Sequence, residues 1–333
     1  MANHVTHQLF KLLQRLKLKS PVESPAKPLL RDTSSATNID IDESWKSSFP
    51  VNVFSAESLE RCDDYPSNYG GLGDVWKCRW RKESEVLVVA VKVVRLHSVR
   101  EEVTHEKSKI LLREASVWAQ LSHKNILPLY GVTYEFGLLP SLVSSWTSNG
   151  SLEQFLGAND LLMPQKINML TQIADGLEYL HSKDIVHGDL TNTSVLINDD
   201  GDPCIVDFGL SSMLLEEEVP YSNMIGNIRW AAPELFEDRS GQSVKPTVTS
   251  DLYSYGWIMF RILTGRPPYH WLTSAAAVLA AKIRPQDPLQ WDPNNTQLPE
   301  ICMKLIEDLC SFNPAVRPSL VTSRDTLQGL FVA

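Results

Sequence analysis

Apolar positions change their spacing along the chain, and the change predicts two kinds of structure in succession. The run from Val86 to Val94 is almost continuously apolar and β-branched, which predicts a buried strand. Apolar residues recur at helical spacing from Lys109 to Leu121. A longer helix is predicted from Pro164 to His181, with Pro164 in its first turn. Its apolar stripe consists of Ile167, Leu170, Ile173, Ala174, Leu177 and Leu180.

The remaining pattern completes the prediction of fold class. Short strands are predicted around Val195–Ile197 and Cys204–Val206, and the pattern after Ser250 is helical to the end of the chain. A strand-rich first part followed by a helix-rich second part predicts an α+β fold with two lobes.

The first sixty residues have a different pattern. Residues 20–37 are rich in Ser, Pro and charge, which predicts a flexible linker. Before this linker, Leu9, Leu12, Leu13 and Leu16 recur at helical spacing among Lys11, Arg15, Lys17 and Lys19. Residues 1–19 could therefore form a basic amphipathic helix that contacts a membrane surface, docks a partner or serves as an import signal. The alternative is a solvated, partly helical tail with no function of its own.

Composition narrows the class of protein. Of the 333 residues, 43% are hydrophobic, which is enough for a sizeable core, and the net charge of −9 argues against a large nucleic-acid interface. The five cysteines form no C-x-x-C pair, which predicts reduced thiols in an intracellular, cytoplasmic protein. No apolar stretch has the length of a transmembrane span.

Two segments of the strand-rich part could bind phosphate. The glycine-dense segment from Asn68 to Val75 could bring its backbone N–H groups close to an anion, although a β-hairpin turn explains the glycines equally well. Lys92 lies within an apolar strand and needs a partner, for which Glu114 on the following helix is a candidate. The alternative is a lysine that reaches solvent at a sheet edge.

Two aspartates follow the long helix at a fixed interval. His187-Gly188-Asp189 precedes Asp207-Phe208-Gly209, and a hairpin of short strands between them would bring both carboxylates together. Such a pair suits a site that holds a metal and steers a nucleophile. Further along come Ala232-Pro233-Glu234, Asp251 and Arg317. The plain interpretation of Glu234 and Arg317 is two exposed charges of little energetic value.

In this order the segments resemble the signature set of eukaryotic protein kinases. The resemblance covers residues 61–331. The flanking sequence is similar to the tyrosine-kinase-like Ser/Thr kinases of basidiomycete fungi. The segments that carry this similarity are Tyr65-Pro66, Val75-Trp76, 125–131 (NILPLYG), His187-Gly188-Asp189 and 229–234 (RWAAPE).

The resemblance implies a division into a tail at 1–60 and a kinase domain at 61–331, with an N-lobe at 61–144, a hinge at 145–148 and a C-lobe at 149–331. It also implies binding of ATP with Mg²⁺ or Mn²⁺. The implied catalytic residues are Asp189, Lys92 and Glu114. The implied ATP-binding residues are Gly70, Gly73, Val75, Ala90, Lys92, Ser145, Thr147 and Leu196. The implied metal ligands are Asp207 and, more weakly, Ser194.

Other implied roles are structural. The resemblance predicts an apolar spine of Trp118, Leu129, His187 and Phe208. It also predicts a buried Glu234–Arg317 ion pair and contacts between Asp251 and the catalytic-loop backbone. Ser144 would border the back of the nucleotide pocket, where a small residue leaves the pocket open.

The sequence departs from the family pattern in the catalytic loop. Thr191 stands where the family has the lysine that neutralises the transferred phosphate, and Ser194 replaces the second metal-binding asparagine. Gly188 replaces the usual arginine, and Asn227 replaces a threonine that helps to position the substrate hydroxyl.

Two functional hypotheses remain open. The chain could be a protein kinase of reduced activity that phosphorylates Ser/Thr, or Tyr, of a protein substrate. Alternatively, it could be an inactive pseudokinase that binds ATP as a signalling scaffold or switch.

Overall fold

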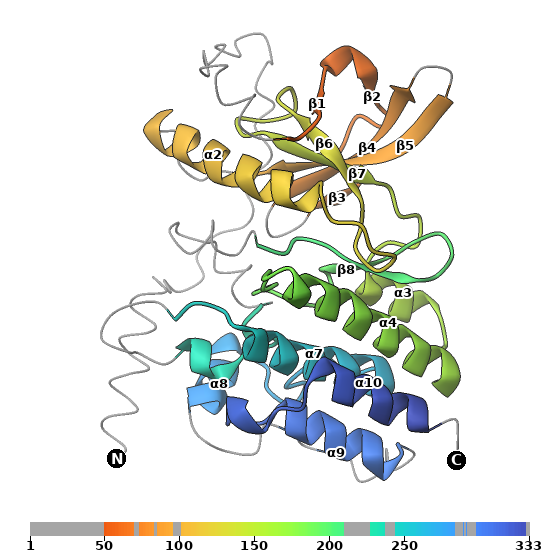
Figure 1. Ribbon diagram of the computed structural model, residues 1–333, viewed down its shortest axis with the longest axis vertical. Coiled ribbons are helices and arrows are strands. Elements are labelled where there is room, and N and C mark those ends of the chain that lie inside the picture. Colours follow the sequence, from red (N-terminus) through yellow and green to blue (C-terminus); the bar gives the residue numbers. More distant parts are fainter. Residues whose placement is uncertain are drawn as a thin grey trace.

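The computed structural model describes residues 50–69, 73–82, 85–95, 101–209, 227–236, 244–283, 289, 291 and 298–330. It contains a sheet with one long helix packed beside it, stacked on a helical part (Figure 1). The molecule therefore has two lobes, one built on a sheet and one mostly helical, and the predicted α+β fold class is confirmed. The basic segment 1–19, the linker and Gly70 lie outside the described residues.

The upper lobe is built on a sheet with the strand order β1-β6-β7-β5-β4-β2, and β3 also pairs with β4. The strands are β1 Val53–Phe54, β2 Leu59–Arg61, β3 Asn68–Tyr69, β4 Gly73–Lys82, β5 Glu85–Val94, β6 Leu129–Thr133 and β7 Ser141–Ser145. A short 3-10 turn, η3 (Ala56–Ser58), precedes β2. The helix α2, Glu101–Trp118, contacts β6.

The lower lobe is mostly helical. Its helices are α3 Leu152–Ala158, α4 Met163–Ser182, α7 Val248–Thr264, α8 Ala275–Ile283, α9 Glu300–Leu309 and α10 Leu320–Gly329. The 3-10 turns η4 Pro233–Phe236 and η5 Pro314–Val316 and the hairpin of β8 Val195–Ile197 with β9 Pro203–Ile205 complete it. Among the described residues, no helix is long and apolar enough to cross a membrane.

The predicted long helix is confirmed as α4, and all of its predicted apolar stripe is buried. Pro164 occupies its first turn, where the missing N–H has no partner to lose. The helix α7 is buried along almost its whole length. It begins at a capping box in which the Thr247 hydroxyl accepts from the Ser250 N–H, and it ends at Gly265 with φ 72°. These helices form the rigid base on which the catalytic loop lies.

Three sequence predictions need adjustment. Only the second half of β5 is a buried strand, since Val89 and Val91 are buried while Val86 and Val88 are exposed. The helix predicted from Lys109 begins earlier, at Glu101. The sheet also begins upstream of residue 61, because β1 pairs with β6 in parallel.

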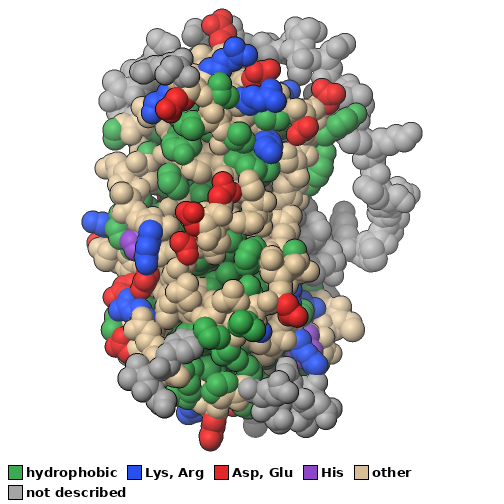
Figure 2. Space-filling view, turned by 90° about the vertical axis from the view of Figure 1, so that its right-hand side faces the viewer, with side chains coloured by type: hydrophobic (Ala, Val, Ile, Leu, Met, Phe, Trp, Pro, Cys, Tyr) green, Lys and Arg blue, Asp and Glu red, His purple; other side chains and the backbone are tan. Residues whose placement is uncertain are grey.

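The surface carries charge of both signs. Figure 2 shows one face of the molecule, on which Lys and Arg side chains lie beside Asp and Glu rather than in one block. On the outer strands of the sheet, Arg79 and Arg81 both pair with Glu60, at 3.8 and 3.1 Å. Exposed pairs of this kind contribute little stability.

Candidate active site

Lys92 lies near the end of β5 and faces the space between the lobes. Its Nζ is 2.5 Å from Oδ2 of Asp207, and both side chains are largely shielded from water. Val91, its neighbour in the strand, is buried on the other face of the sheet, as strand alternation requires. Because β5 lies between β7 and β4 and the lysine is largely shielded from solvent, the plain alternative of an edge lysine is wrong.

The expected pairing of Lys92 with Glu114 is not formed. Among the described residues, the ion pair of Lys92 is with Asp207, and Glu114 lies half-buried on α2. Burial raises the pKa of the Glu114 carboxyl, which Arg113 lowers. The side chain of Glu114 lies against Gly209, just after Asp207. Lys92 therefore pairs with a carboxylate that follows the long helix, and spacing along the chain does not decide between Asp207 and Glu114.

The first part of the catalytic loop is fixed by Asp251 of α7. The backbone N–H groups of His187 and Gly188 donate to its two carboxylate oxygens at 2.8 and 2.9 Å. The His181 ring lies 2.8 Å from the same carboxylate. Asp251 is almost fully buried, so these contacts satisfy a charge that would otherwise be costly. The predicted contact between Asp251 and the loop backbone is confirmed.

Asp189 follows this fixed segment and lies beside Asp207. Burial, and then the negative charge of Asp207, raise the pKa of Asp189 to about 7, while Lys92 lowers it. A base whose pKa lies near neutral pH is well placed to accept a proton.

Asn227 is the donor that holds the Asp189 side chain. Its Nδ2 donates to Oδ2 of Asp189 at 2.7 Å. The sequence marked Asn227 only as a departure from the family, because the two residues are far apart along the chain. The amide of Asn227 therefore fixes one oxygen of the Asp189 carboxylate and leaves the other without this donor.

In the second part of the catalytic loop, the side-chain hydroxyls bond within the loop. The Thr191 side chain is buried, and its hydroxyl lies 2.9 Å from that of Thr193. The buried Ser194 hydroxyl accepts from the Thr191 N–H at 2.8 Å and donates toward the Thr191 carbonyl at 3.1 Å. Neither side chain places a positive charge near Asp189. The weak metal-ligand role of Ser194 stays a prediction, and its oxygen is engaged within the loop.

The predicted adenine-binding residues lie on the strands that border the space between the lobes. Val75 is on β4 and pairs across the sheet with Lys92, Ala90 is on β5 opposite Ser144, and Leu196 is on β8. At the hinge, the Ser145 hydroxyl lies 2.8 Å from that of Tyr130.

Two further predicted positions have local backbone roles. The Thr147 carbonyl accepts from the Gly150 N–H at 3.3 Å. A side chain at Gly73 would collide with the carbonyl of Val93, so the close pairing of β4 with β5 requires glycine there. These contacts fix the hinge and the start of β4 beside the predicted nucleotide pocket.

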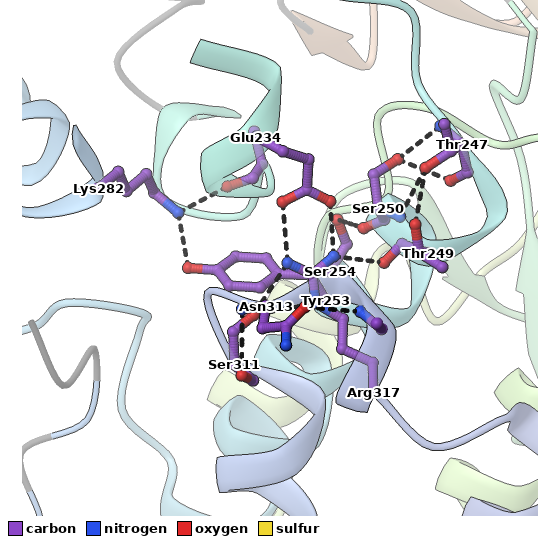
Figure 3. A network of polar contacts seen from close by, with 12 residues as sticks. Glu234, Thr247, Thr249, Ser250, Tyr253, Ser254, Lys282, Ser311, Asn313 and Arg317 are labelled. Atoms are coloured by element: carbon purple, nitrogen blue, oxygen red, sulfur yellow. Dashed lines mark hydrogen bonds and ion pairs between the residues drawn. The ribbon is translucent and has the colours of Figure 1, made fainter. Parts of the chain in front are cut away.

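Three of the four residues of the predicted spine are in contact, and the predicted brace is formed. The ring of Phe208 contacts Trp118 at 5.1 Å and His187 at 6.4 Å between centroids. Figure 3 shows the bidentate pair of Arg317 with Glu234, at 2.6 and 2.8 Å. The Arg317 side chain has no exposed surface, so this pair is buried and the exposed-charge interpretation is wrong.

Asp207 fits a divalent cation. Its carboxylate offers hard oxygen ligands, and Mg²⁺ is commonly held by one or two carboxylates together with phosphate oxygens. The effect of Asp207 on the pKa of Asp189 indicates that the two negative charges are close enough to repel, and a cation would relieve this repulsion.

Comparisons with known proteins agree with this geometry. The family described as protein tyrosine and serine/threonine kinase matches residues 68–327. Serine/threonine-protein kinase TNNI3K of Mus musculus is 30% identical over 213 residues, 62% of this chain and 24% of that protein. Ephrin type-A receptor 5 of Gallus gallus is 34% identical over 220 residues, which cover 64% of this chain and 21% of that protein. Tyrosine protein-kinase src-1 of Caenorhabditis elegans is 33% identical over 211 residues, which cover 60% of this chain and 36% of that protein. The chain thus spans well under half the length of these relatives.

Proposed function

Since this chain belongs to the protein tyrosine and serine/threonine kinase family, we propose that it transfers the γ-phosphate of ATP to hydroxyl groups of a protein substrate, at a reduced rate. The observation that carries the proposal is the contact between Asn227 and Asp189, at 2.7 Å. It keeps the proton-accepting carboxylate oriented although the lysine of the family pattern is absent from the loop.

Asp189 is the proposed proton acceptor. It would steer the attacking hydroxyl and take its proton. Its pKa, raised to about 7, makes the carboxylate a stronger base than an ordinary aspartate, although a smaller share of it is ionised at neutral pH. The Asn227 amide donates to the carboxylate, so the free oxygen of Asp189 is directed toward the acceptor. Because Asp251 fixes the backbone just before Asp189, the carboxylate has little freedom to turn away.

Lys92 and Asp207 are the proposed phosphate-binding and metal-binding groups. When bound, Mg²⁺ or Mn²⁺ neutralises charge on the phosphates and on the departing group. Lys92 holds Asp207 at 2.5 Å, so it would have to exchange this partner for phosphate oxygens when ATP enters. Glu114 is the carboxylate on α2 that could then receive the lysine.

The proposed reduction in rate follows from Thr191 and Ser194. Transfer of a phosphoryl group is mostly positioning and charge stabilisation, and loss of one preorganised electrostatic contact costs about 10²–10³ in rate. The two replacements need not add, because groups that act together are not independent.

A second candidate is an ATP-binding scaffold without transferase activity. It is favoured by the observation that Lys92 pairs with Asp207 and not with Glu114, since a catalytically competent kinase needs the pair between the strand lysine and the helix glutamate.

Several finer features belong to the proposal. Similarity to relatives named as a serine/threonine kinase and as a tyrosine kinase supports Ser/Thr, or Tyr, as acceptor. The flanking motifs support a tyrosine-kinase-like group of the fungal type. The kinase domain runs to residue 331, with its start moved upstream to include β1. The cysteines are unpaired, which supports an intracellular, cytoplasmic setting. Contact of residues 1–19 with a membrane surface rests on sequence pattern alone.

Autophosphorylation with radiolabelled ATP, with Asp207→Asn as the matched control, tests the proposed function. We expect the wild-type protein to become labelled, and we expect the signal of the variant to be lower by a factor of about 10²–10³. Equal labelling of the two proteins would leave the scaffold candidate in its place.

A further inference from the structure

Lys282 of α8 is a buried lysine outside the site described so far. Its side chain is only 2% exposed, and within the described part of the chain no carboxylate pairs with it. Burial lowers its pKa well below the ordinary value. Its Nζ lies over the rings of Tyr253 and Tyr269, at 4.6 and 4.7 Å from their centroids. An apolar side chain would fill this space without the cost of burying an amine, so packing alone does not account for a lysine.

What the amine adds is a hydrogen-bond donor aimed at backbone. The Lys282 Nζ donates to the carbonyl of Ala231 at 2.6 Å and lies 3.1 Å from the Tyr253 hydroxyl. Figure 3 shows Lys282 approaching the hydroxyl end of Tyr253, with the Glu234–Arg317 pair toward the other end of the same side chain. The lysine therefore bonds the backbone at Ala231, and Arg317 bonds Glu234 three residues later.

Ala231 connects this contact to the catalytic loop. Its own N–H donates to the Asn227 carbonyl at 3.1 Å, and the Trp230 N–H donates to the same carbonyl at 3.0 Å. These bonds close a tight turn that starts at Asn227. The Asn227 side chain leaves this turn to reach Asp189 at 2.7 Å. Ala231, whose carbonyl accepts from Lys282, is thus bonded through its own N–H to Asn227, the residue that holds the proton acceptor.

We infer that Lys282 is a positioning residue for phosphoryl transfer, which holds the 227–231 turn where the Asn227 amide meets Asp189. This inference rests on the proposed function. Arg229 contributes from the same turn, since its guanidinium donates to the carbonyls of Pro268, Tyr269 and Leu272. The Arg229 side chain extends from the turn to bond other parts of the chain, whereas Lys282 bonds the backbone of the turn itself.

The test compares Lys282→Met, which keeps the length and packing of the side chain, with Lys304→Met on the exposed face of α9. We expect Lys282→Met to lower kcat by about tenfold or more while the KM for ATP changes by less than about twofold. Amide hydrogen exchange at 227–231 should become faster, and exchange in α7 should stay as in the wild type. Lys304→Met should change neither quantity.

A second variant separates positioning from general stability. Tyr253→Phe removes one partner of Lys282 but leaves the bond to Ala231, so kcat should fall by less than about threefold. If Tyr253→Phe and Lys282→Met reduce kcat equally, or if Lys282→Met also speeds exchange throughout α7, the lysine is part of the core and the inference is overturned. If Lys282→Met fails to fold, Lys282→Gln takes its place. The Gln side chain is one bond shorter than that of Lys and does not reach the Ala231 carbonyl, so amide exchange at 227–231 should again become faster.

The exchange measurement keeps this test apart from the test of the proposed function. If the wild-type protein transfers no phosphate, the proposed function fails. Faster exchange confined to 227–231 in Lys282→Met would still support the hold of Lys282 on the turn. Unchanged exchange at 227–231 in that variant would overturn it, whatever the activity of the wild type.

Discussion

The two halves of the catalytic loop differ in what holds them. The first half, at His187 and Gly188, is bonded to Asp251 of a distant helix, at 2.8 and 2.9 Å. In the second half, the hydroxyls of Thr191 and Ser194 bond within the loop, while the backbone carbonyls of Asn192 and Ser194 accept from the N–H groups of Glu153 and Val206. The loop thus keeps the bonds that fix its backbone just before Asp189 and lacks the lysine of the family pattern. The bonds to Asp251 are the framework half of the loop, and Thr191 and Ser194 are its chemical half. Substitutions can alter each half alone.

The largest expected effect comes from breaking the framework half. Asp251→Ala would leave the His187 and Gly188 amides without their acceptor, and each buried unpaired amide costs about 1–3 kcal/mol. We expect the free energy of unfolding to fall by about 2–6 kcal/mol. Urea denaturation would measure this, with the exposed Asp160→Ala as control. Similar midpoints for the two variants would show that the first half of the loop does not depend on Asp251.

The next effect restores the chemical half. Thr191→Lys with Ser194→Asn should raise the rate of phosphoryl transfer by more than about tenfold, because it returns a positive charge and a metal-binding amide to the loop. Peptide phosphorylation under saturating ATP would measure the gain. Thr193→Lys is the matched control, since it adds the same charge at an exposed position of the same loop. No gain, or an equal gain in the control, would place the defect elsewhere.

The smallest effect concerns pH. The pKa of Asp189 is raised to about 7, so kcat should fall toward about tenfold per pH unit as pH drops below about 7. Thr191→Lys should move this fall to lower pH, because a nearby positive charge favours the carboxylate. The folded protein holds this proton more tightly than the unfolded chain. The contribution of Asp189 to stability is therefore largest at low pH and declines as pH rises from 3.8 to about 7. A flat profile from about pH 6 to about pH 8 would contradict the assignment of Asp189.

The sequence predicted the features that depend on order and periodicity. The stripe of α4 follows from periodicity, and it is found. The Glu234–Arg317 pair and the contact of Phe208 with Trp118 follow from the resemblance to protein kinases, and both are found. The choice of Lys92 between Glu114 and Asp207 was not predictable, because it depends on how the lobes and α2 lie.

Other contacts gave no signal in the sequence. Asn227 meets Asp189 across 38 positions, and Lys282 meets Ala231 across 51. Only the fold brings such residues together. Lys282 follows an apolar segment and looks like the exposed end of a helix, yet its side chain is buried.

The most direct test of reduced but genuine activity is phosphate transfer from radiolabelled ATP to a peptide that contains Ser and Thr. The wild-type protein and Asp189→Asn would be compared at about pH 8, where the Asp189 carboxylate is ionised. The account predicts that the wild type is faster by roughly a hundredfold or more, because only it has a proton acceptor. Equal rates in the two proteins would contradict it and leave an ATP-binding scaffold.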